Sequence, residues 1–306
     1  MSSSPKFELA FLHPRYWVLW LSLSLLWLVI LLPYPVLLML GWVLGKLLYW
    51  VGGKRRKIAR RNIELCFPEL SEAERVRLLK QNFSNYGMAL LETGMSWWWP
   101  AWRFNRLVKI EGLEYLDQLQ GQGALLIAIH FTHLEIGAAA LNLHRSIDGM
   151  HRPHKNRLYD YIQSKGRGNR NDETITYPRK DVRQVLLALK RGRIIWYAPD
   201  QDYGIKQGIF APFMGVNAAT VTATARFASS GKAKIIPLSQ QRLSGGRGYK
   251  VTIHPPLEGF PQGDEYEDAV AINLLLEALI RQQPEAYMWV HRRFKTRPPG
   301  EPSLYK

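Results

Sequence analysis

A long uncharged run marks the N-terminal part of the chain. No Asp, Glu, Lys or Arg occurs from Tyr16 to Gly45. As one continuous helix, this run would measure about 45 Å, against about 30 Å for the hydrocarbon core of a bilayer. Pro33 and Pro35 interrupt it. We predict one transmembrane helix over about residues 17–37, kinked or ended near the prolines, and an interfacial helix to about Trp50. Residues 1–50 would then form a membrane anchor.

Two other interpretations fit this run less well. A cleaved signal peptide has a shorter apolar stretch, and it ends at a small-residue cleavage site that is not found before the rest of this chain. A buried helix pair of a soluble protein is the second alternative, but a core helix rarely lacks a charged face for so long. The pattern therefore favours a membrane segment.

After residue 60, short apolar runs alternate with helical patterns. Buried-strand patterns occur at residues 123–129, 193–198, 234–239 and 249–254. Helical patterns occur at residues 71–99, 133–143, 182–190, 218–229 and 268–281. Alternation of strands and helices predicts an α/β fold, with a largely parallel sheet flanked by helices. We assign residues 51–306 to this domain.

The composition narrows the class of protein. The 306 residues carry a net charge of +16, with a sequence pI near 9.9. A mean hydropathy of −0.19 excludes a polytopic membrane protein. The single cysteine, Cys66, excludes an internal disulfide framework and a cysteine-cluster zinc site. The positive charge predicts an anionic partner, which leaves nucleic acid, a membrane surface, a phosphorylated substrate and an acidic protein as candidates.

Charged residues at the two ends of the apolar run predict its orientation. The N-terminal flank carries Lys6 and Arg15, opposed by Glu8. The C-terminal flank is far more basic, and its cations can also hold anionic headgroups. The positive-inside rule therefore places the domain that follows in the cytoplasm. The C-terminal cations are Lys46, Lys54, Arg55, Arg56, Lys57, Arg60 and Arg61.

A histidine directly follows the strand pattern at residues 123–129. His130 should therefore lie at the carboxyl edge of the sheet, where open α/β sheets place their sites. Glu135 falls in the first turn of the next helix, and the intervening turn can bring it back beside His130. A carboxylate that binds one imidazole nitrogen raises the basicity of the other. The pair predicts a general base for a substrate hydroxyl.

Glu135 also has a structural explanation. Thr132 and Glu135 have the spacing of a capping box, with Thr132 as N-cap. A zinc site made of His130, His133 and Glu135 is not favoured, because the H-E-x-x-H motif needs both histidines on one helix face. We expect no bound metal.

Basic side chains gather downstream of His130. Arginine binds phosphate or carboxylate through two parallel hydrogen bonds, so the cluster is a candidate anion site, with a solvated surface as the ordinary alternative. Pro153, Gly166 and Gly168 indicate that parts of this segment are loop. The cluster consists of Arg152, Lys155, Arg157, Lys165, Arg167 and Arg170.

Two further segments carry polar groups. Asp200 and Asp202 follow the strand predicted at 193–198, at the same sheet edge as His130, where they can orient an arginine or cap a turn. A third basic group lies at residues 291–297.

These features together resemble a known family. His130 and Glu135 fit the H-x4-D/E motif of glycerolipid-type acyltransferases. The chain is similar, nearly end to end, to the late acyltransferases of lipid A biosynthesis, the lauroyl or palmitoleoyl transferases. The similarity rests on residues 11–17 (FLHPRYW), 32–35 (LPYP), 62–69 (NIELCFPE), 92–95 (ETGM), 196–204 (WYAPDQDYG) and 291–298 (HRRFKTRP).

The resemblance implies a reaction and its participants. An acyl carrier protein thioester would donate a fatty acyl chain to a hydroxyl on the acyl chains of a Kdo-bearing, tetra-acylated lipid A precursor, a Kdo2-lipid IVA-type acceptor, at the cell inner membrane. By motif position, His130 would be the base and Glu135 its partner. No cofactor is implied, and His133 receives no role. Substrate contacts would come from Arg152, Arg167, Arg170 and Asp200.

The residues fit this reaction chemically. The acceptor hydroxyl can attack the thioester directly, because a thiolate is a good leaving group. Backbone N–H groups near residues 131–133 are candidate stabilisers of the oxyanion. An acidic carrier protein suits an enzyme of net charge +16.

Two other functions remain open at this stage. A glycerophosphate or lysophospholipid acyltransferase would share the His130 and Glu135 pair. A membrane-anchored protein that binds nucleic acid through its basic face is less favoured, because the chain has no nucleic-acid-binding motif.

Overall fold

The fold is built on one sheet that is parallel at all but one of its strand pairs. The computed structural model describes residues 6–305. Their strands are β1 (Val108–Glu111), β2 (Ala124–Ile127), β3 (Ile147–His151), β4 (Thr176–Pro178), β5 (Ile194–Tyr197), β6 (Gly208–Phe213), β7 (Val216–Val221), β8 (Lys234–Arg242) and β9 (Tyr249–Ile253). In this part of the chain the main sheet has the order β1-β9-β8-β2-β5-β3-β4, and only the β8–β9 pair is antiparallel. Strands β6 and β7 form a separate antiparallel hairpin.

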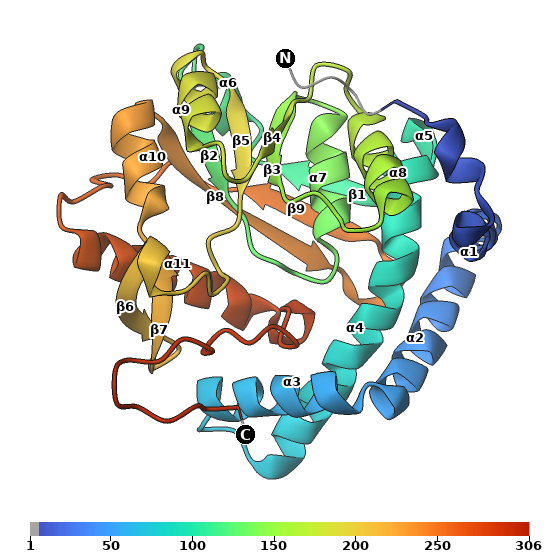
Figure 1. Cartoon of the computed structure of the whole chain (residues 1–306), viewed down its shortest axis with the longest axis horizontal. Helices are drawn as coiled ribbons and strands as arrows, with labels where there is room; N and C mark the ends of the chain where they lie inside the picture. Colours follow the sequence, from blue (N-terminus) through green and yellow to red (C-terminus); the bar gives the residue numbers. More distant parts are fainter. Residues whose placement is uncertain (1–5, 306) are drawn as a thin grey trace.

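Helices pack on both faces of this sheet (Figure 1). They are α1 (Trp17–Val29), α2 (Tyr34–Val51), α3 (Gly53–Cys66), α4 (Glu72–Trp98), α5 (Ala101–Asn105), α6 (Glu114–Asp117), α7 (Leu134–Asn142), α8 (Arg157–Gly168), α9 (Val182–Lys190), α10 (Ala223–Gly231) and α11 (Glu265–Gln282). The predicted fold class, a largely parallel sheet flanked by helices, is confirmed.

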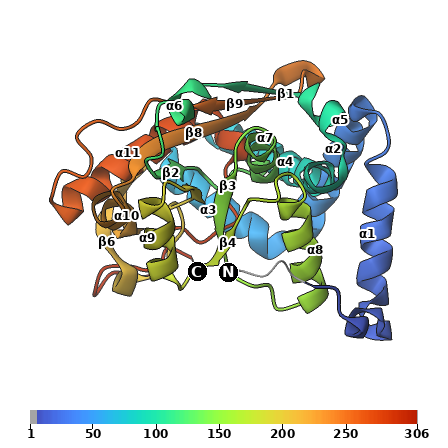
Figure 2. The same ribbon diagram turned by 90° about the horizontal axis from the view of Figure 1, so that it is seen from above.

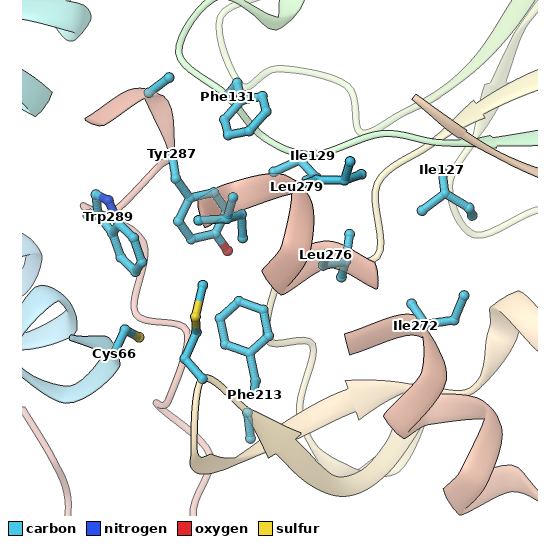
Figure 3. Packing of buried hydrophobic residues seen from close by; sticks show 14 of the residues in the cluster. Cys66, Ile127, Ile129, Phe131, Phe213, Ile272, Leu276, Leu279, Tyr287 and Trp289 are labelled. Atoms are coloured by element: carbon cyan, nitrogen blue, oxygen red, sulfur yellow. The ribbon is translucent and has the colours of Figure 1, made fainter. Parts of the chain in front are cut away.

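Strand β2 lies at the centre and is buried on both faces. Leu125 and Ile127 face a core that contains residues of α9, α10 and α11. Ala124 and Leu126 face a second core, built with α7 and parts of α2 and α4. A parallel strand covered on both sides needs apolar residues at every position, which explains its continuous apolar sequence. Figure 3 shows the first core around Phe213, Tyr287 and Trp289.

Several predicted elements have nearly the observed bounds. Helix α9 has the predicted ends, and strands β2, β5, β8 and β9 lie within or close to their predicted ranges. The helix predicted over residues 218–229 is wrong in its first part. Residues 216–221 form β7, and α10 begins only at Ala223. Because β7 pairs with β6 along six residue pairs, strand pairing decides the conformation of this small-residue segment.

The basic segment at residues 152–170 contains more helix than we predicted. Residues 157–168 form α8, with Asn156 as its N-cap. A Cβ atom on Gly166 would lie 2.4 Å from Cγ of Trp97, so this glycine permits close packing of α8 on α4. Gly166 is therefore a packing position within a helix and does not mark a loop.

The uncharged N-terminal run forms two helices. Helix α1 ends at Val29, and α2 begins at Tyr34 with Pro35 in its first turn, where the missing N–H leaves no helical bond unmade. The single helix predicted over residues 17–37 is therefore wrong in its extent, although the break falls beside the prolines as expected. The second helix ends at Val51, next to the predicted Trp50. Both helices lie along one side of the molecule (Figures 1 and 2).

Helix α2 crosses α4 at very short distance. A Cβ atom on Gly87 would lie 2.1 Å from the carbonyl oxygen of Gly41 and 2.2 Å from the backbone nitrogen of Gly45. Within residues 6–305, the one helix long and apolar enough to cross a membrane is α2, which overlaps the segment predicted as interfacial, whereas the apolar helix at residues 14–29 is shorter than such a span. The exposed apolar side chains of α1 and α2 include Trp17, Val18, Leu21, Leu25, Trp27, Trp42, Val43, Leu47, Trp50 and Val51.

Candidate active site

His130 and Asp200 meet because their two strands are paired in register. Ile127, at the end of β2, is the partner of Tyr197, at the end of β5. His130 lies three residues after Ile127, and Asp200 lies three residues after Tyr197. Nδ1 of His130 lies 2.5 Å from Oδ1 of Asp200, and the backbone N–H of His130 donates to Oδ2 at 3.1 Å. Parallel pairing thus brings together two groups that are 70 residues apart.

The pair is electrostatically matched. Burial opposes ionisation of the imidazole, but the Asp200 carboxylate outweighs it and raises the pKa of His130. Burial likewise opposes ionisation of Asp200, but the charge of His130 and its hydrogen bonds lower the pKa of that carboxyl. The His130 side chain is 23% exposed, whereas Asp200 is 1% exposed. With Nδ1 bound to Asp200, Nε2 is the ring nitrogen that can accept a proton.

Glu135 contacts Arg167 and Trp97 rather than His130. Nε of Arg167 donates to both carboxylate oxygens at 3.1 and 3.2 Å, and Nη2 donates to Oε1. Nε1 of Trp97 donates to Oε2 at 3.2 Å. The expected contact between Glu135 and His130 is therefore wrong, because α7 packs against α4 and directs this carboxylate toward Trp97 and α8. Asp200 was expected to contact substrate, but it is buried, and its carboxylate binds Nδ1 of His130 in the place expected for Glu135.

The expected capping box is also wrong. Helix α7 begins at Leu134 with His133 as its N-cap, and no side-chain hydrogen bond caps it. The hydroxyl of Thr132 has no partner within residues 6–305. The backbone N–H of Thr132 donates to the carbonyl of Ala286 at 2.8 Å. The ion pair with Arg167, and not helix capping, accounts for the position of Glu135.

Two of the three amides expected to stabilise an oxyanion are already engaged. Besides Thr132, Phe131 donates its N–H to the carbonyl of Ile129 at 2.7 Å. The remaining amide of the three belongs to His133.

The ring of His133 is buried and stacked on Phe131 with an interplanar angle of 8°. Burial and the nearby Arg242 charge lower the pKa of His133 to about 3, so the ring is neutral. Among residues 6–305 no cluster of His, Cys, Asp and Glu has the arrangement of a metal site.

Arg170 binds protein carbonyls at the end of α4. Nε donates to Ser96 at 2.8 Å, Nη1 donates to Trp99 at 2.8 Å, and Nη2 donates to Met95 at 3.1 Å and to Ser96 at 2.6 Å. Burial lowers the pKa of Arg170 to about 10. The carbonyls near the end of a helix lack the N–H partners that a further turn would supply, and a guanidinium is a suitable donor to them. The structure thus gives Arg170 a structural role, although it was expected to contact substrate.

A cavity of about 920 Å³ opens beside His130. Glu135 and Arg167 line it, and so does Arg152, which is exposed and makes no side-chain hydrogen bond or ion pair in the part of the chain described. Apolar side chains line other parts of the wall, among them Trp97, Leu134, Trp196, Ile209 and Phe227. The cavity therefore combines cations with an apolar surface.

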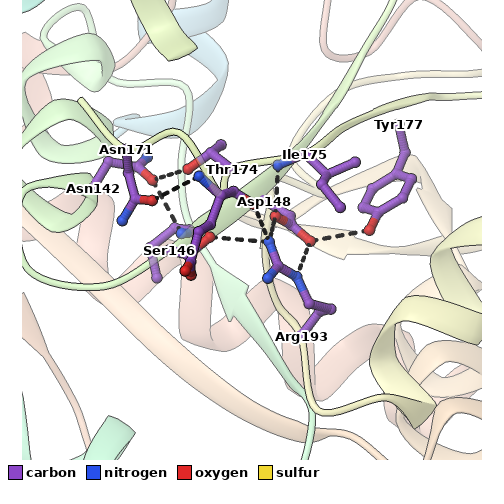
Figure 4. Close-up of polar contacts among 10 residues, drawn as sticks. Asn142, Ser146, Asp148, Asn171, Thr174, Ile175, Tyr177 and Arg193 are labelled. Carbon is purple, nitrogen blue, oxygen red and sulfur yellow. Dashed lines mark hydrogen bonds and ion pairs between the residues drawn. The ribbon is translucent and has the colours of Figure 1, made fainter. Parts of the chain in front are cut away.

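Asp148, which lines this cavity, belongs to a buried ion pair whose contacts are drawn in Figure 4. Asp148 is fully buried and accepts hydrogen bonds from Nε of Arg193 at 2.8 Å, from the Ile175 amide at 2.8 Å and from the Tyr177 hydroxyl at 3.1 Å. Arg193 also donates to the carbonyl of Glu173 at 2.7 Å. This network joins β3 and β4 to the residue that precedes β5, and its own contacts neutralise both charges.

The C-terminal basic segment supports the loop that carries Asp200. Asp202 accepts hydrogen bonds from the backbone N–H of Thr296 at 2.7 Å and from its hydroxyl at 2.9 Å. Arg293 is buried and donates to the carbonyl of Ala219 at 2.7 Å. The hydroxyl of Tyr287 donates to the backbone carbonyl of Asp200 at 3.3 Å. Residues far apart in sequence thus fix the position of Asp200.

Sequence reasoning missed two residues of the site. Trp97 lies at the end of a helix that we predicted, yet nothing in its spacing indicates the contact with Glu135. Arg179 lines the cavity, and its guanidinium lies 4.5 Å from the ring centre of Tyr203. Its position after a short strand was a usable signal, but β4 has only three residues and was not predicted.

These features describe a histidine–aspartate pair beside a cavity whose wall is partly apolar and partly cationic. Residues 4–296 match the family described as bacterial lipid A biosynthesis acyltransferase. The chain therefore belongs to the lipid A biosynthesis acyltransferases.

Similar proteins cover nearly the whole chain. The lipid A biosynthesis lauroyltransferase of Escherichia coli K12 is 44% identical and covers 100% of both chains. The palmitoleoyltransferase of the same organism is 43% identical, and a lipid A biosynthesis acyltransferase of Haemophilus influenzae is 41% identical, each over 98% of both chains. A crystal structure of a 1-acyl-sn-glycerophosphate acyltransferase from Thermotoga maritima aligns with a TM-score of 0.38 and 14% identity, over 82% of this chain and 95% of that one.

Proposed function

We propose that this acyltransferase moves a fatty acyl chain from an acyl carrier protein thioester to a hydroxyl on an acyl chain of a Kdo-bearing, tetra-acylated lipid A precursor. The observation that carries this proposal is the Asp200–His130 pair beside the cavity, with Nε2 of His130 as its available base. The full-length relatives include a lauroyltransferase and a palmitoleoyltransferase, which supports a fatty acyl chain as the transferred group.

The proposed reaction needs no acyl-enzyme. Nε2 of His130 accepts the proton of the acceptor hydroxyl while its oxygen attacks the thioester carbonyl. The Asp200 carboxylate stabilises the imidazolium that forms, and it holds the ring in the tautomer with the proton on Nδ1. Collapse of the tetrahedral intermediate breaks the carbon–sulfur bond. The imidazolium then returns the proton to the departing thiolate, which restores the base.

Glu135 acts through Arg167 in this proposal. Arg167 uses Nε and Nη2 to bind Glu135, so the N–H groups of Nη1 remain for an anionic oxygen of the substrate. Trp97 fixes the other side of the Glu135 carboxylate. Glu135 would therefore be a positioning residue, and Arg167 would contact substrate. Arg152 would add a second cation at the same cavity.

The surroundings suit the proposed acceptor. Phosphates and acidic sugars would bind the cavity cations, and acyl chains would bind the apolar wall. We further propose that residues 1–50 hold the enzyme at the inner membrane, with the catalytic domain on the cytoplasmic side. The exposed apolar side chains of α1 and α2 and the basic residues of α3 support this location.

The test supplies the purified enzyme with a panel of acyl carrier protein thioesters of different chain lengths and the tetra-acylated acceptor, and weighs the product by mass spectrometry. We expect the acceptor to gain one acyl group. A lysophospholipid is offered in parallel, and acylation of the lysophospholipid alone would refute the proposed acceptor. Transfer from acyl-coenzyme A but not from the carrier protein would refute the proposed donor.

A further inference from the structure

The cations that line the cavity fall into two groups. In the first group the protein itself neutralises or binds the charge. Arg167 pairs with Glu135, carbonyls of α4 hold Arg170, and Arg179 lies against the ring of Tyr203. These side chains are therefore engaged within the protein, apart from Nη1 of Arg167, which the proposed function gives to the acceptor.

The second group is exposed and unpaired. Besides Arg152, which directly follows β3, it has three members. Lys180 precedes α9, Lys206 lies in the short 3-10 helix η3 (Ile205–Gln207), and Arg226 lies in the first turn of α10. All three line the cavity, and none makes an ion pair within residues 6–305. The acids of the cavity wall are Glu135 and Asp148, both paired inside, and the exposed Glu265. The rim on this side therefore carries an uncompensated positive charge.

The position of this group separates it from the apolar surface. Figures 1 and 2 both place α9 and α10 on one side of β3 and β4, and α8 and α1 on the other. Phe11, Tyr16 and Leu158 form a small core that joins the segment before α1 to α8. An acceptor held in the membrane would therefore reach the cavity along α8. A soluble partner would then approach from the side of α9 and α10.

We propose that Lys180, Lys206 and Arg226 form the docking surface for an acidic carrier protein, which delivers its acyl thioester into the cavity from the side opposite α1. This inference rests on the proposed function, and it assigns the donor and the acceptor to different mouths of one cavity. Complementary charge at a rim accelerates association and makes it sensitive to salt. These lysine and arginine side chains attract the carrier protein and take no part in proton transfer.

The test compares two variants that each lose three charges. The first combines Lys180→Gln, Lys206→Gln and Arg226→Gln. The matched control combines Lys190→Gln, Arg191→Gln and Lys234→Gln, which are exposed residues at the amino edge of the sheet. Each enzyme is assayed with the acyl carrier protein thioester and with acyl-coenzyme A, which offers phosphates without a protein.

We expect the first variant to raise the KM for the carrier protein donor about tenfold at low salt. The KM for acyl-coenzyme A, the KM for the acceptor and kcat should stay within twofold, and the defect should shrink near 0.5 M salt, since ions screen exposed charges. The control variant should match the wild type with both donors.

Other outcomes overturn the docking surface. Equal losses with both donors would mean that these cations bind phosphate, and a higher acceptor KM would assign them to the lipid. Weaker binding to vesicles of anionic phospholipid, with unchanged donor kinetics, would assign them to the membrane. Unchanged kinetics would leave a solvated surface. If the wild type takes no acyl group from the carrier protein, the proposed donor fails as well, and this outcome is visible before any variant is made.

Discussion

Replacing Asp200 with asparagine tests the catalytic pair directly. The side chain keeps its size, but one of its two oxygens becomes an NH2 group. In the structure Oδ1 binds Nδ1 of His130 and Oδ2 binds the backbone N–H of the same residue. An amide that accepts from the backbone N–H presents its NH2 group to Nδ1. The proton of the imidazole then moves to Nε2, and the ring nitrogen beside the cavity no longer acts as a base.

The expected loss is large. Asp200→Asn removes the charge that stabilises the imidazolium and favours the wrong tautomer, and comparable changes cost about 10³- to 10⁴-fold in turnover. This loss corresponds to about 4–5.5 kcal/mol of transition-state stabilisation. Folding should suffer less, because a hydrogen bond to a charged group contributes about 1.5–3 kcal/mol.

The pH profile provides an independent readout. His130 acts as a base only when neutral, and Asp200 raises its pKa. Activity of the wild type should therefore rise with pH through that raised pKa. Without the carboxylate the pKa of His130 falls, so the residual activity of the variant should begin to rise at lower pH. The assay measures kcat/KM from pH 5 to pH 9 for wild type and variant, together with their melting temperatures.

Stability should depend on pH in a matching way. The pKa of Asp200 is lower in the folded protein than in the unfolded chain. Its contribution is therefore present above the unfolded pKa, about 3.9, and is lost as the pH falls through the folded value. A variant with near-normal turnover and an unshifted pH profile would refute the assignment of Asp200 to His130.

Three further changes test other parts of the structure. Glu135→Gln should raise the acceptor KM about ten- to hundredfold, because the substitution releases Arg167 from its ion pair. The pH profile of kcat/KM should change little, because Glu135 does not contact His130, and a shifted profile would contradict this. Arg170→Gln should lower the free energy of unfolding in urea by about 3 kcal/mol, because the N–H groups of Arg170 bind carbonyls at the end of α4. The acceptor KM should stay within about twofold, and a large rise in this KM would show that Arg170 binds substrate. Gly87→Ala should cost about 1–3 kcal/mol through overpacking between α2 and α4, and unchanged thermal melting would contradict that crossing.

The sequence predicts the elements of this fold better than their contacts. The apolar pattern of residues 182–190 contains its own helical period, so α9 has the predicted bounds. Residues 218–229 contain small and β-branched side chains that suit a strand or a helix, and the choice is made by pairing with β6. The break between α1 and α2 follows from local proline chemistry, whereas the packing of α2 on α4 depends on glycines that are 42 and 46 residues apart along the chain.

The candidate site shows the same division. His130 is recognisable because it follows an apolar strand. Its partner was assigned to Glu135, which is near in sequence, because spacing reveals only local neighbours. The register of Ile127 with Tyr197 selects Asp200 instead, and this register is set by the packing of the whole sheet. Similarly, Arg170 has the sequence context of a ligand-binding arginine, and only the folded chain brings it to the end of α4.

Helix α4 connects the apolar surface to the site, and this connection restricts how its sequence can change. Gly87 of α4 packs on α2, and Trp97, ten residues further along α4, binds Glu135. Inserting one residue between them would turn Trp97 by about 100° and advance it by about 1.5 Å. The indole would then leave the carboxylate, and the carbonyls bound by Arg170 would face another direction. We therefore expect that homologous proteins accept substitutions throughout this stretch but keep its length unchanged.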